Sequence, residues 1–104
     1  MKRGEVWWVD LGTPGSRRPV LLLSRNDAYG ARNLILVSPI SIRMRQLPSE
    51  LPLGTADGMP KECVVNLENL TTIPKDSLAD RLTTLSPKKM EELDAALKFA
   101  LGME

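Results

Sequence analysis

The stretch from Arg17 to Ser24 constrains the fold of this chain more than any other segment. Arg17 and Arg18 precede Pro19, and the unbroken apolar run 20–23 follows. Because a proline cannot donate to a strand ladder, Pro19 suits the first position of a strand, and the run predicts a strand buried on both faces. Arg18 is then expected where a loop enters the core, on a rigid support that could aim its guanidinium at a phosphate. A solvated surface arginine is the alternative.

The length and composition of the chain bound its architecture. With 104 residues, 42% of them hydrophobic, the chain is long enough for one modest core, so we expect a single domain over residues 1–104. No apolar run approaches the ~20 residues of a membrane-spanning helix, and residues 1–5 lead directly into strand-like sequence without the apolar core of a signal peptide. These features predict a cytoplasmic protein without a membrane partner.

Two residue types limit the chemistry that is available. The chain has no histidine, which excludes a His general base, a Ser-His-Asp triad and a His-rich metal site. Its single cysteine, Cys63, lies beside two valines and is expected to be a small core residue rather than a nucleophile. An enzyme with this inventory would work with Arg, Ser, Thr, Asn and carboxylates, which suits phosphoryl transfer, and no metal or other cofactor is expected.

The net charge of +1 hides an asymmetry along the chain. Residues 1–45 carry eight basic and three acidic groups, a balance of +5, whereas residues 46–104 carry six basic and ten acidic groups, a balance of −4. Seven of the eight basic groups in the first part are arginines, which pair with phosphates and stack on bases, so this part suits a nucleic-acid partner. The alternative is that folding interleaves the two parts and no basic patch remains.

Short strands bounded by Gly and Pro dominate the rest of the chain. β-branched, aromatic and leucine-rich segments predict strands at 5–10, 19–24, 34–42, 49–53, 62–67 and 79–85, with one helical turn near 25–30 and a loop from Leu11 to Ser16. Pro39 interrupts the hydrogen bonding of its strand and predicts an edge or a bulge there. Trp7 and Trp8 are adjacent, so one can enter the core while the other lines an outer groove or a subunit contact.

The C-terminal segment has the clearest helical pattern. Ser86 suits the N-cap with Pro87 at the first helical position, and Gly102 suits the stop. One apolar stripe is expected to face the core; it consists of Met90, Leu93, Leu97, Ala100 and Leu101. Five or more short strands with one amphipathic helix indicate a small, mainly β, barrel-like domain with the helix packed on it.

A hydroxyl follows the second apolar strand beside two further arginines. If Ile40 and Ile42 face the core, Ser41 faces the other way, next to Arg43 and Arg45. A serine that simply ends a strand is the alternative.

Six segments keep an order and spacing typical of one known family, and with the closing helix they cover nearly the whole chain. They are Lys2–Trp7, Arg18–Leu21, Ser24–Asp27, Val37–Ser41, Leu47–Pro48 and Val64–Ile73. On these segments the chain resembles the MazF/PemK family of toxin endoribonucleases, the mRNA interferases of type II toxin–antitoxin systems. The resemblance implies an SH3-like barrel of the CcdB/MazF type, a homodimer, a cognate antitoxin as partner, DNA binding only through that antitoxin, and metal-independent cutting of single-stranded RNA at short sequences.

The resemblance also assigns residues. The family's catalytic arginine, which precedes a proline, corresponds to Arg18, and its catalytic hydroxyl, usually a threonine, corresponds to Ser41. The family's usual glutamine corresponds to Asn69, a shorter amide. The candidate RNA-binding positions are Gly15, Ser16, Arg17, Arg43, Arg45, Leu47, Glu68 and Asn69.

The residue types of the chain and its resemblance to the MazF/PemK family point to the same mechanism. The ribose 2′-OH would attack the adjacent phosphorus and leave a 2′,3′-cyclic phosphate, with Arg18 stabilising the developing charge and Ser41 holding an oxygen by hydrogen bond. Two other functions remain open at this point: a CcdB-like protein that poisons a topoisomerase by binding, and a catalytically silent barrel that binds nucleic acid or protein.

Overall fold

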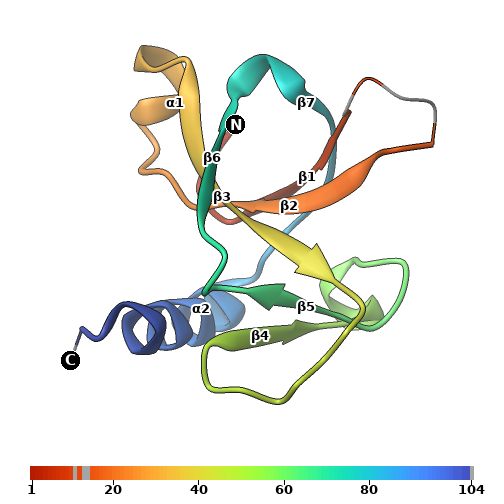
Figure 1. Ribbon diagram of the computed structural model, residues 1–104, viewed down its shortest axis with the longest axis vertical. Coiled ribbons are helices and arrows are strands. Elements are labelled where there is room, and N and C mark those ends of the chain that lie inside the picture. Colours follow the sequence, from red (N-terminus) through yellow and green to blue (C-terminus); the bar gives the residue numbers. More distant parts are fainter. Residues whose placement is uncertain (11, 13–14, 104) are drawn as a thin grey trace.

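The computed structural model describes residues 1–10, 12 and 15–103 (Figure 1). Leu11, Thr13 and Pro14, which belong to the predicted loop 11–16, lie outside the described residues. Across the described part, the strands are β1 (Glu5–Val9), β2 (Arg18–Leu22), β3 (Leu34–Ser41), β4 (Glu50–Leu53), β5 (Cys63–Asn66), β6 (Thr71–Pro74) and β7 (Leu78–Thr84). The helices are α1 (Ala28–Ala31) and α2 (Pro87–Leu101), with single 3₁₀ turns at Thr55–Asp57 and Lys75–Ser77.

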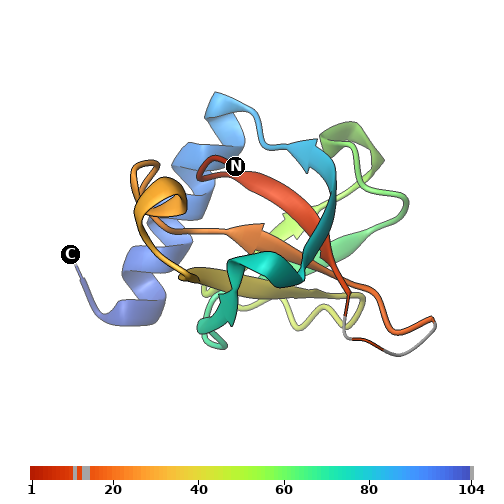
Figure 2. The same cartoon turned by 90° about the horizontal axis from the view of Figure 1, so that it is seen from above.

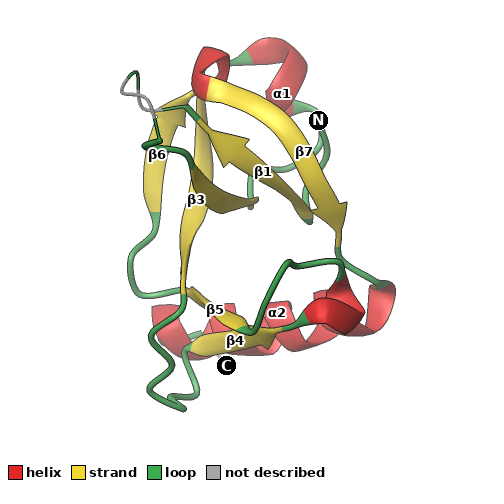
Figure 3. Ribbon diagram, turned by 90° about the vertical axis from the view of Figure 1, so that its right-hand side faces the viewer, coloured by secondary structure: helices red, strands yellow, loops and turns green. Residues whose placement is uncertain are grey.

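The strands form one curled antiparallel sheet in the order β4-β5-β3-β2-β1-β7, and β6 pairs with β3 (Figures 1 and 3). The long strand β3 organises this sheet because it changes partners along its length. Its first half pairs with β6, residues 37–39 pair with β2, and its last two residues pair with β5. Pro39 pairs with Val20 of β2 in an uninterrupted register, so the predicted bulge is absent there, and an edge exists only on the side of Pro39 that faces away from β2. The proline lies where β3 has left β6 and has not yet met β5, which is a position where a missing backbone N–H costs no ladder bond.

The curled sheet encloses two clusters of buried side chains. Leu21 of β2 belongs to the larger cluster, which also takes in β4, β5 and α2, whereas Val20 and Leu22 belong to a smaller cluster with Tyr29 and Ile35. The β2 strand is therefore buried on both faces, as its unbroken apolar run predicts. This burial leaves only the beginning of β2, at Arg18, exposed to solvent.

The α2 helix begins and ends where its sequence predicts. The Ser86 side chain accepts a hydrogen bond from the Lys89 backbone N–H at 3.2 Å, and Gly102 ends the helix with a positive φ of 71°. Leu93 and Ala96 face the larger cluster. Leu101 does not: its side chain is exposed, because the last turn of α2 extends past the sheet (Figure 2). Among the described residues, no helix is long and apolar enough to cross a membrane.

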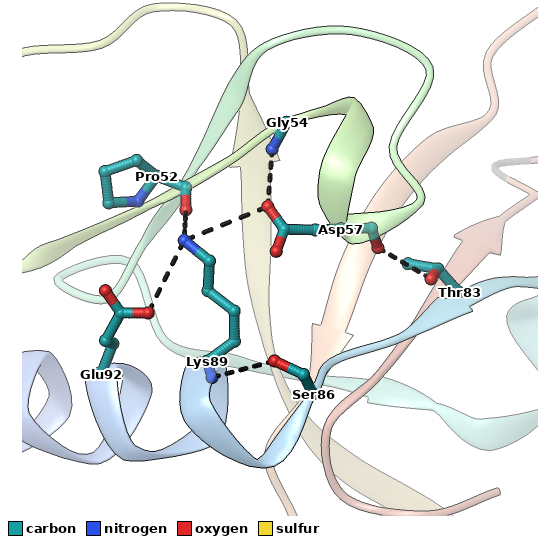
Figure 4. Close-up of polar contacts among 7 residues, drawn as sticks. All are labelled: Pro52, Gly54, Asp57, Thr83, Ser86, Lys89 and Glu92. Atoms are coloured by element: carbon teal, nitrogen blue, oxygen red, sulfur yellow. Dashed lines mark hydrogen bonds and ion pairs between the residues drawn. The ribbon is translucent and has the colours of Figure 1, made fainter.

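Polar contacts fix the connection between β4 and β5 to α2 and β7 (Figure 4). Asp57 Oδ2 accepts a hydrogen bond from the Gly54 N–H at 2.9 Å and lies 4.0 Å from Lys89 Nζ of α2, which also donates to the Pro52 carbonyl of β4 at 2.9 Å. On the other side, Thr83 Oγ1 donates to the Asp57 carbonyl at 2.9 Å. The connection continues into residues 59–61, so these contacts also hold one wall of the pocket described next.

Candidate functional site

Arg18 lies at the mouth of an open pocket. It is the first residue of β2, pairs with Val9 of β1, and is exposed. Its guanidinium makes no hydrogen bond or ion pair with any other described residue. The pocket has a volume of about 290 Å³ and is lined by Trp8, Arg17, Arg18, Pro19, Ile40, Ile42, Met59, Pro60, Lys61 and Cys63. Unpaired within the described part of the chain, this permanently charged donor group beside a concave surface is suited to bind a phosphate.

Arg17 is held in place beside Arg18 by two contacts. One of its terminal nitrogens pairs with the Asp80 carboxylate, and its guanidinium lies over the Trp8 ring at 5.7 Å from the centroid. Trp7 lies on the other face of β1, against the smaller core cluster, and its Nε1 donates to Glu5 Oε1 at 2.8 Å. The prediction that the two tryptophans serve opposite faces is therefore confirmed.

Ser41 ends β3 next to the same pocket. The printed β2–β3 pairing ends at Val20–Pro39, and Ser41 lies two residues beyond that pair on β3, as Arg18 does on β2. Ile40 and Ile42 line the pocket on either side of it in sequence, whereas Ser41 is exposed and is not one of the lining residues. Its Oγ accepts a hydrogen bond from the Arg43 N–H at 3.0 Å, which leaves the hydroxyl proton available for donation to a ligand.

Ile42 corrects one prediction at this strand end. Ile40 is buried as expected, but Ile42 is 66% exposed and does not face the core. The reason is that β3 ends at Ser41, so the alternation of faces stops before Ile42. An exposed isoleucine at the pocket edge adds apolar surface that a base can contact.

The remaining RNA-binding candidates fall into two groups. Gly15, with a positive φ of 77°, and Ser16 lie just before Arg17. The others lie on two exposed segments, the loop 42–48 and the turn after β5. Glu68 and Asn69 follow the end of β5 at Asn66, whereas Cys63 at the beginning of β5 lines the Arg18 pocket. At about 3.3 Å per residue, the two ends of this strand are about 10 Å apart. The structure therefore brings Arg17 and Arg18 to one pocket, with Ser41 between two of its lining residues in sequence, and places Glu68 and Asn69 some distance along the surface.

Lys61 is a cation at the pocket that sequence reasoning missed. It is exposed, and its side chain makes no hydrogen bond or ion pair within the described part of the chain. Its sequence context, a Gly- and Pro-containing turn in the more acidic part of the chain, gave no signal, because its role depends on the packing of residues 59–61 across the sheet. Arg18 and Lys61 make no ion pair with any described residue, whereas the charge of Arg17 is paired with that of Asp80.

Cys63 closes the inner side of this pocket and is not activated. Burial raises the pKa of its thiol, and the nearby carboxylates of Glu62 and Asp57 raise it further, although Lys61 acts in the opposite direction. Cys63 is buried, so its prediction as a core residue is confirmed. Within residues 1–10, 12 and 15–103, no three His, Cys, Asp or Glu side chains come together in a group that could hold a metal ion.

Comparisons with known proteins agree on one family. Residues 2–101 match the family model described as PemK-like, MazF-like toxin of type II toxin-antitoxin system. The probable endoribonuclease MazF2 of Mycobacterium tuberculosis is 36% identical over 103 residues, which cover 98% of this chain and 99% of that protein. Among solved structures, an endoribonuclease in complex with its cognate antitoxin from a mycobacterial species superposes with a TM-score of 0.87 at 29% identity, covering 100% of this chain and 97% of the other. Mycobacterium tuberculosis toxin MazF-mt6 gives a TM-score of 0.86 at 26% identity, covering 96% and 98%.

Proposed function

The chain belongs to the PemK-like, MazF-like toxins of type II toxin–antitoxin systems and is an endoribonuclease of that family, and we propose that it cuts single-stranded RNA at short sequences to inhibit growth. The observation that carries the proposal is the guanidinium of Arg18, unpaired among the described residues, at the mouth of a pocket that Ile40 and Ile42 line on either side of Ser41 in sequence. The related proteins are named as endoribonucleases, which favours RNA cutting over the topoisomerase poison and the silent barrel.

The proposed reaction uses a nucleophile that the substrate supplies. The ribose 2′-oxygen attacks the adjacent phosphorus, the P–O2′ bond forms while the P–O5′ bond breaks, the 2′-OH loses its proton, and the leaving 5′-oxygen gains one. The products are a 2′,3′-cyclic phosphate and a 5′-OH end. Arg18 stabilises the negative charge that develops on the phosphorane, and the Ser41 hydroxyl donates to a phosphate oxygen. Because an arginine stays protonated in proteins, its electrostatic role has more support here than a role as general base.

The donor set of the chain supports a reaction without a metal ion. No histidine is present in the chain, and the pocket residues supply cations, apolar groups and a buried thiol with a raised pKa rather than carboxylate ligands. Positively charged side chains can supply the charge stabilisation that a metal ion would otherwise provide. The test of the function is to incubate the purified protein with a long defined RNA in excess chelator. Sequencing the ends should reveal cuts at one short sequence, and the absence of any cut would overturn the proposal.

Ser41 offers a graded test of the hydroxyl. We expect Ser41→Ala to slow cutting by about tenfold or more, because it removes a hydrogen bond to a charged oxygen, worth about 1.5–3 kcal/mol. Ser41→Thr should stay active because it keeps the hydroxyl. Single-turnover rates on one oligonucleotide give both values. If threonine inactivates the protein and alanine does not, Ser41 is a structural residue.

We propose that the protein is a cytoplasmic homodimer that a cognate antitoxin silences, with DNA binding occurring only through that antitoxin. Structures of related toxins contain the antitoxin, which supports this partner. Large apolar side chains stay exposed on the described chain, and a second copy could cover part of them. They include Leu34, Leu36, Phe99, Leu101 and Met103. Light scattering at micromolar concentration should give about twice the chain mass of 11.5 kDa; a monomer alone would contradict the dimer.

A further inference from the structure

The exposed loop 42–48 has one backbone feature that needs an explanation. Gln46 has a φ of 57°, and it is the only non-glycine residue with a positive φ in the described part of the chain. The amides on either side of it converge on a single atom: the N–H groups of Arg45 and Leu47 donate to Glu50 Oε1 at 3.0 and 3.3 Å. Successive amides around a left-handed residue form a concavity that binds anions. Here the anion is a side chain of the protein itself.

Glu50 is suited to hold this loop because it is itself fixed. It is the first residue of β4 and is only 8% exposed, and its own N–H donates to the Leu47 carbonyl at 3.0 Å. The loop and Glu50 therefore bind each other at three points, two through the carboxylate and one through the backbone. A charge-assisted hydrogen bond is about twice as strong as a neutral one, so removing the carboxylate should release Arg45 and Leu47 together.

Asn66 holds the turn 67–70, the other exposed segment that carries RNA-binding candidates, in the same way. Glu50 and Asn66 are direct partners in the β4–β5 ladder. The Asn66 side-chain Oδ1 accepts a hydrogen bond from the Glu68 N–H at 3.0 Å, and the Asn66 carbonyl accepts one from the Asn69 N–H at 3.3 Å. One pair of facing residues thus holds both segments that carry RNA-binding candidates away from the Arg18 pocket.

We propose that Glu50 and Asn66 are positioning residues that place the loop 42–48 and the turn 67–70 into one surface for the bases flanking the cut. Neither residue needs to contact RNA. Glu50 fixes the positions of Arg45 and Leu47. Asn66 fixes the positions of Glu68 and Asn69. The loop and the turn therefore keep a fixed spacing across the β4–β5 ladder. This inference rests on the proposed RNA-cutting function, but its first test does not require activity.

The first test is amide hydrogen exchange on the protein without RNA, measured by NMR. Glu50→Ala should speed exchange at the Arg45 and Leu47 amides by about tenfold or more, because their acceptor is lost, and should leave Leu93 in α2 unchanged. Glu50→Gln keeps an acceptor oxygen and should restore most of the protection. Asn66→Ala should speed exchange at the Glu68 amide and leave Arg45 and Leu47 protected. Unchanged exchange at these amides in folded variants would overturn the proposal.

The second test is the split between KM and kcat on a short RNA. Because Glu50 holds Arg45 and Leu47, which the proposal places on flanking bases, and does not hold Ser41 or Arg43, Glu50→Ala should raise KM about tenfold and leave kcat within about twofold. Glu91→Ala removes an exposed carboxylate from α2 and is the matched control, with no expected change in either constant. A drop in kcat at constant KM would contradict the positioning role, as would equal effects of Glu50→Ala and Glu50→Gln. If the wild-type protein cuts no RNA, the proposed function fails, while the exchange measurement still decides whether Glu50 holds the loop.

Discussion

Replacing Arg18 by alanine is expected to abolish RNA cutting while leaving the protein folded. The expected loss in kcat is on the order of 10² or more, because in the proposed mechanism the variant removes the charged set of donors that stabilises the developing negative charge. The fold should survive because the Arg18 side chain is exposed and makes no hydrogen bond or ion pair with any other described residue. Single-turnover cleavage of one oligonucleotide gives the rate, and thermal unfolding followed by circular dichroism gives the stability.

Two further variants test whether cutting needs the guanidinium of Arg18 itself or only a positively charged side chain. Arg18→Lys keeps the positive charge but loses the planar fork, so it should recover only a small part of the rate. Arg32→Ala removes an exposed arginine that lies at the end of α1 and does not line the Arg18 pocket, and it should cut at the wild-type rate. Near-wild-type cleavage by folded Arg18→Ala would remove Arg18 from the mechanism.

Much of the fold could be predicted because its strongest signals are local. The apolar run after Pro19 predicts a strand buried on both faces, and the two core clusters on either side of β2 explain why that run has no polar interruption. Ser86, Pro87 and Gly102 mark the ends of α2 through backbone geometry that needs no tertiary information. The mainly β architecture with a C-terminal helix followed from these elements.

The elements that escaped prediction depend on long-range contacts. Strand β6 consists of Thr71–Pro74, is largely exposed and lacks apolar alternation, so only its pairing with the first half of β3 makes it a strand. The place of Pro39 also depends on long-range contacts, since it lies where β3 has left β6 and has not yet met β5. Neither feature can be predicted from the neighbouring residues in the sequence.

The candidate site was predictable only in part, for a related reason. A proline after Arg18 and an apolar strand before Ser41 identify two strand ends, and the antiparallel β2–β3 pairing places both ends on the same side of the Val20–Pro39 pair. Lys61 and Glu50 gave no comparable signal. Lys61 reaches the pocket through the packing of the β4–β5 connection, and Glu50 acts on backbone amides three and five residues earlier in the chain.

The chemistry of the cut can be tested on the substrate rather than on the protein. If the ribose 2′-OH is the attacking group, replacing the single ribose 5′ to the scissile phosphate by deoxyribose must stop cleavage at that bond. Binding through phosphates and bases should weaken only slightly, because most of those contacts do not involve the 2′-OH. The experiment compares one oligonucleotide with and without that hydroxyl, in excess chelator, and measures both cleavage and binding.

The same experiment distinguishes this mechanism from hydrolysis by an activated water. With the 2′-OH present, the 5′ fragment should end in a 2′,3′-cyclic phosphate, and chelation should leave the rate unchanged, since Arg18 and Ser41 supply the stabilisation of charge in the proposed reaction. Retained binding without cleavage of the deoxy-substituted oligonucleotide would place the loss in the chemical step. Cleavage of the substituted bond, or activity that disappears with the chelator, would indicate attack by water or a metal-bound hydroxide and would overturn the mechanism even if Arg18 proved essential.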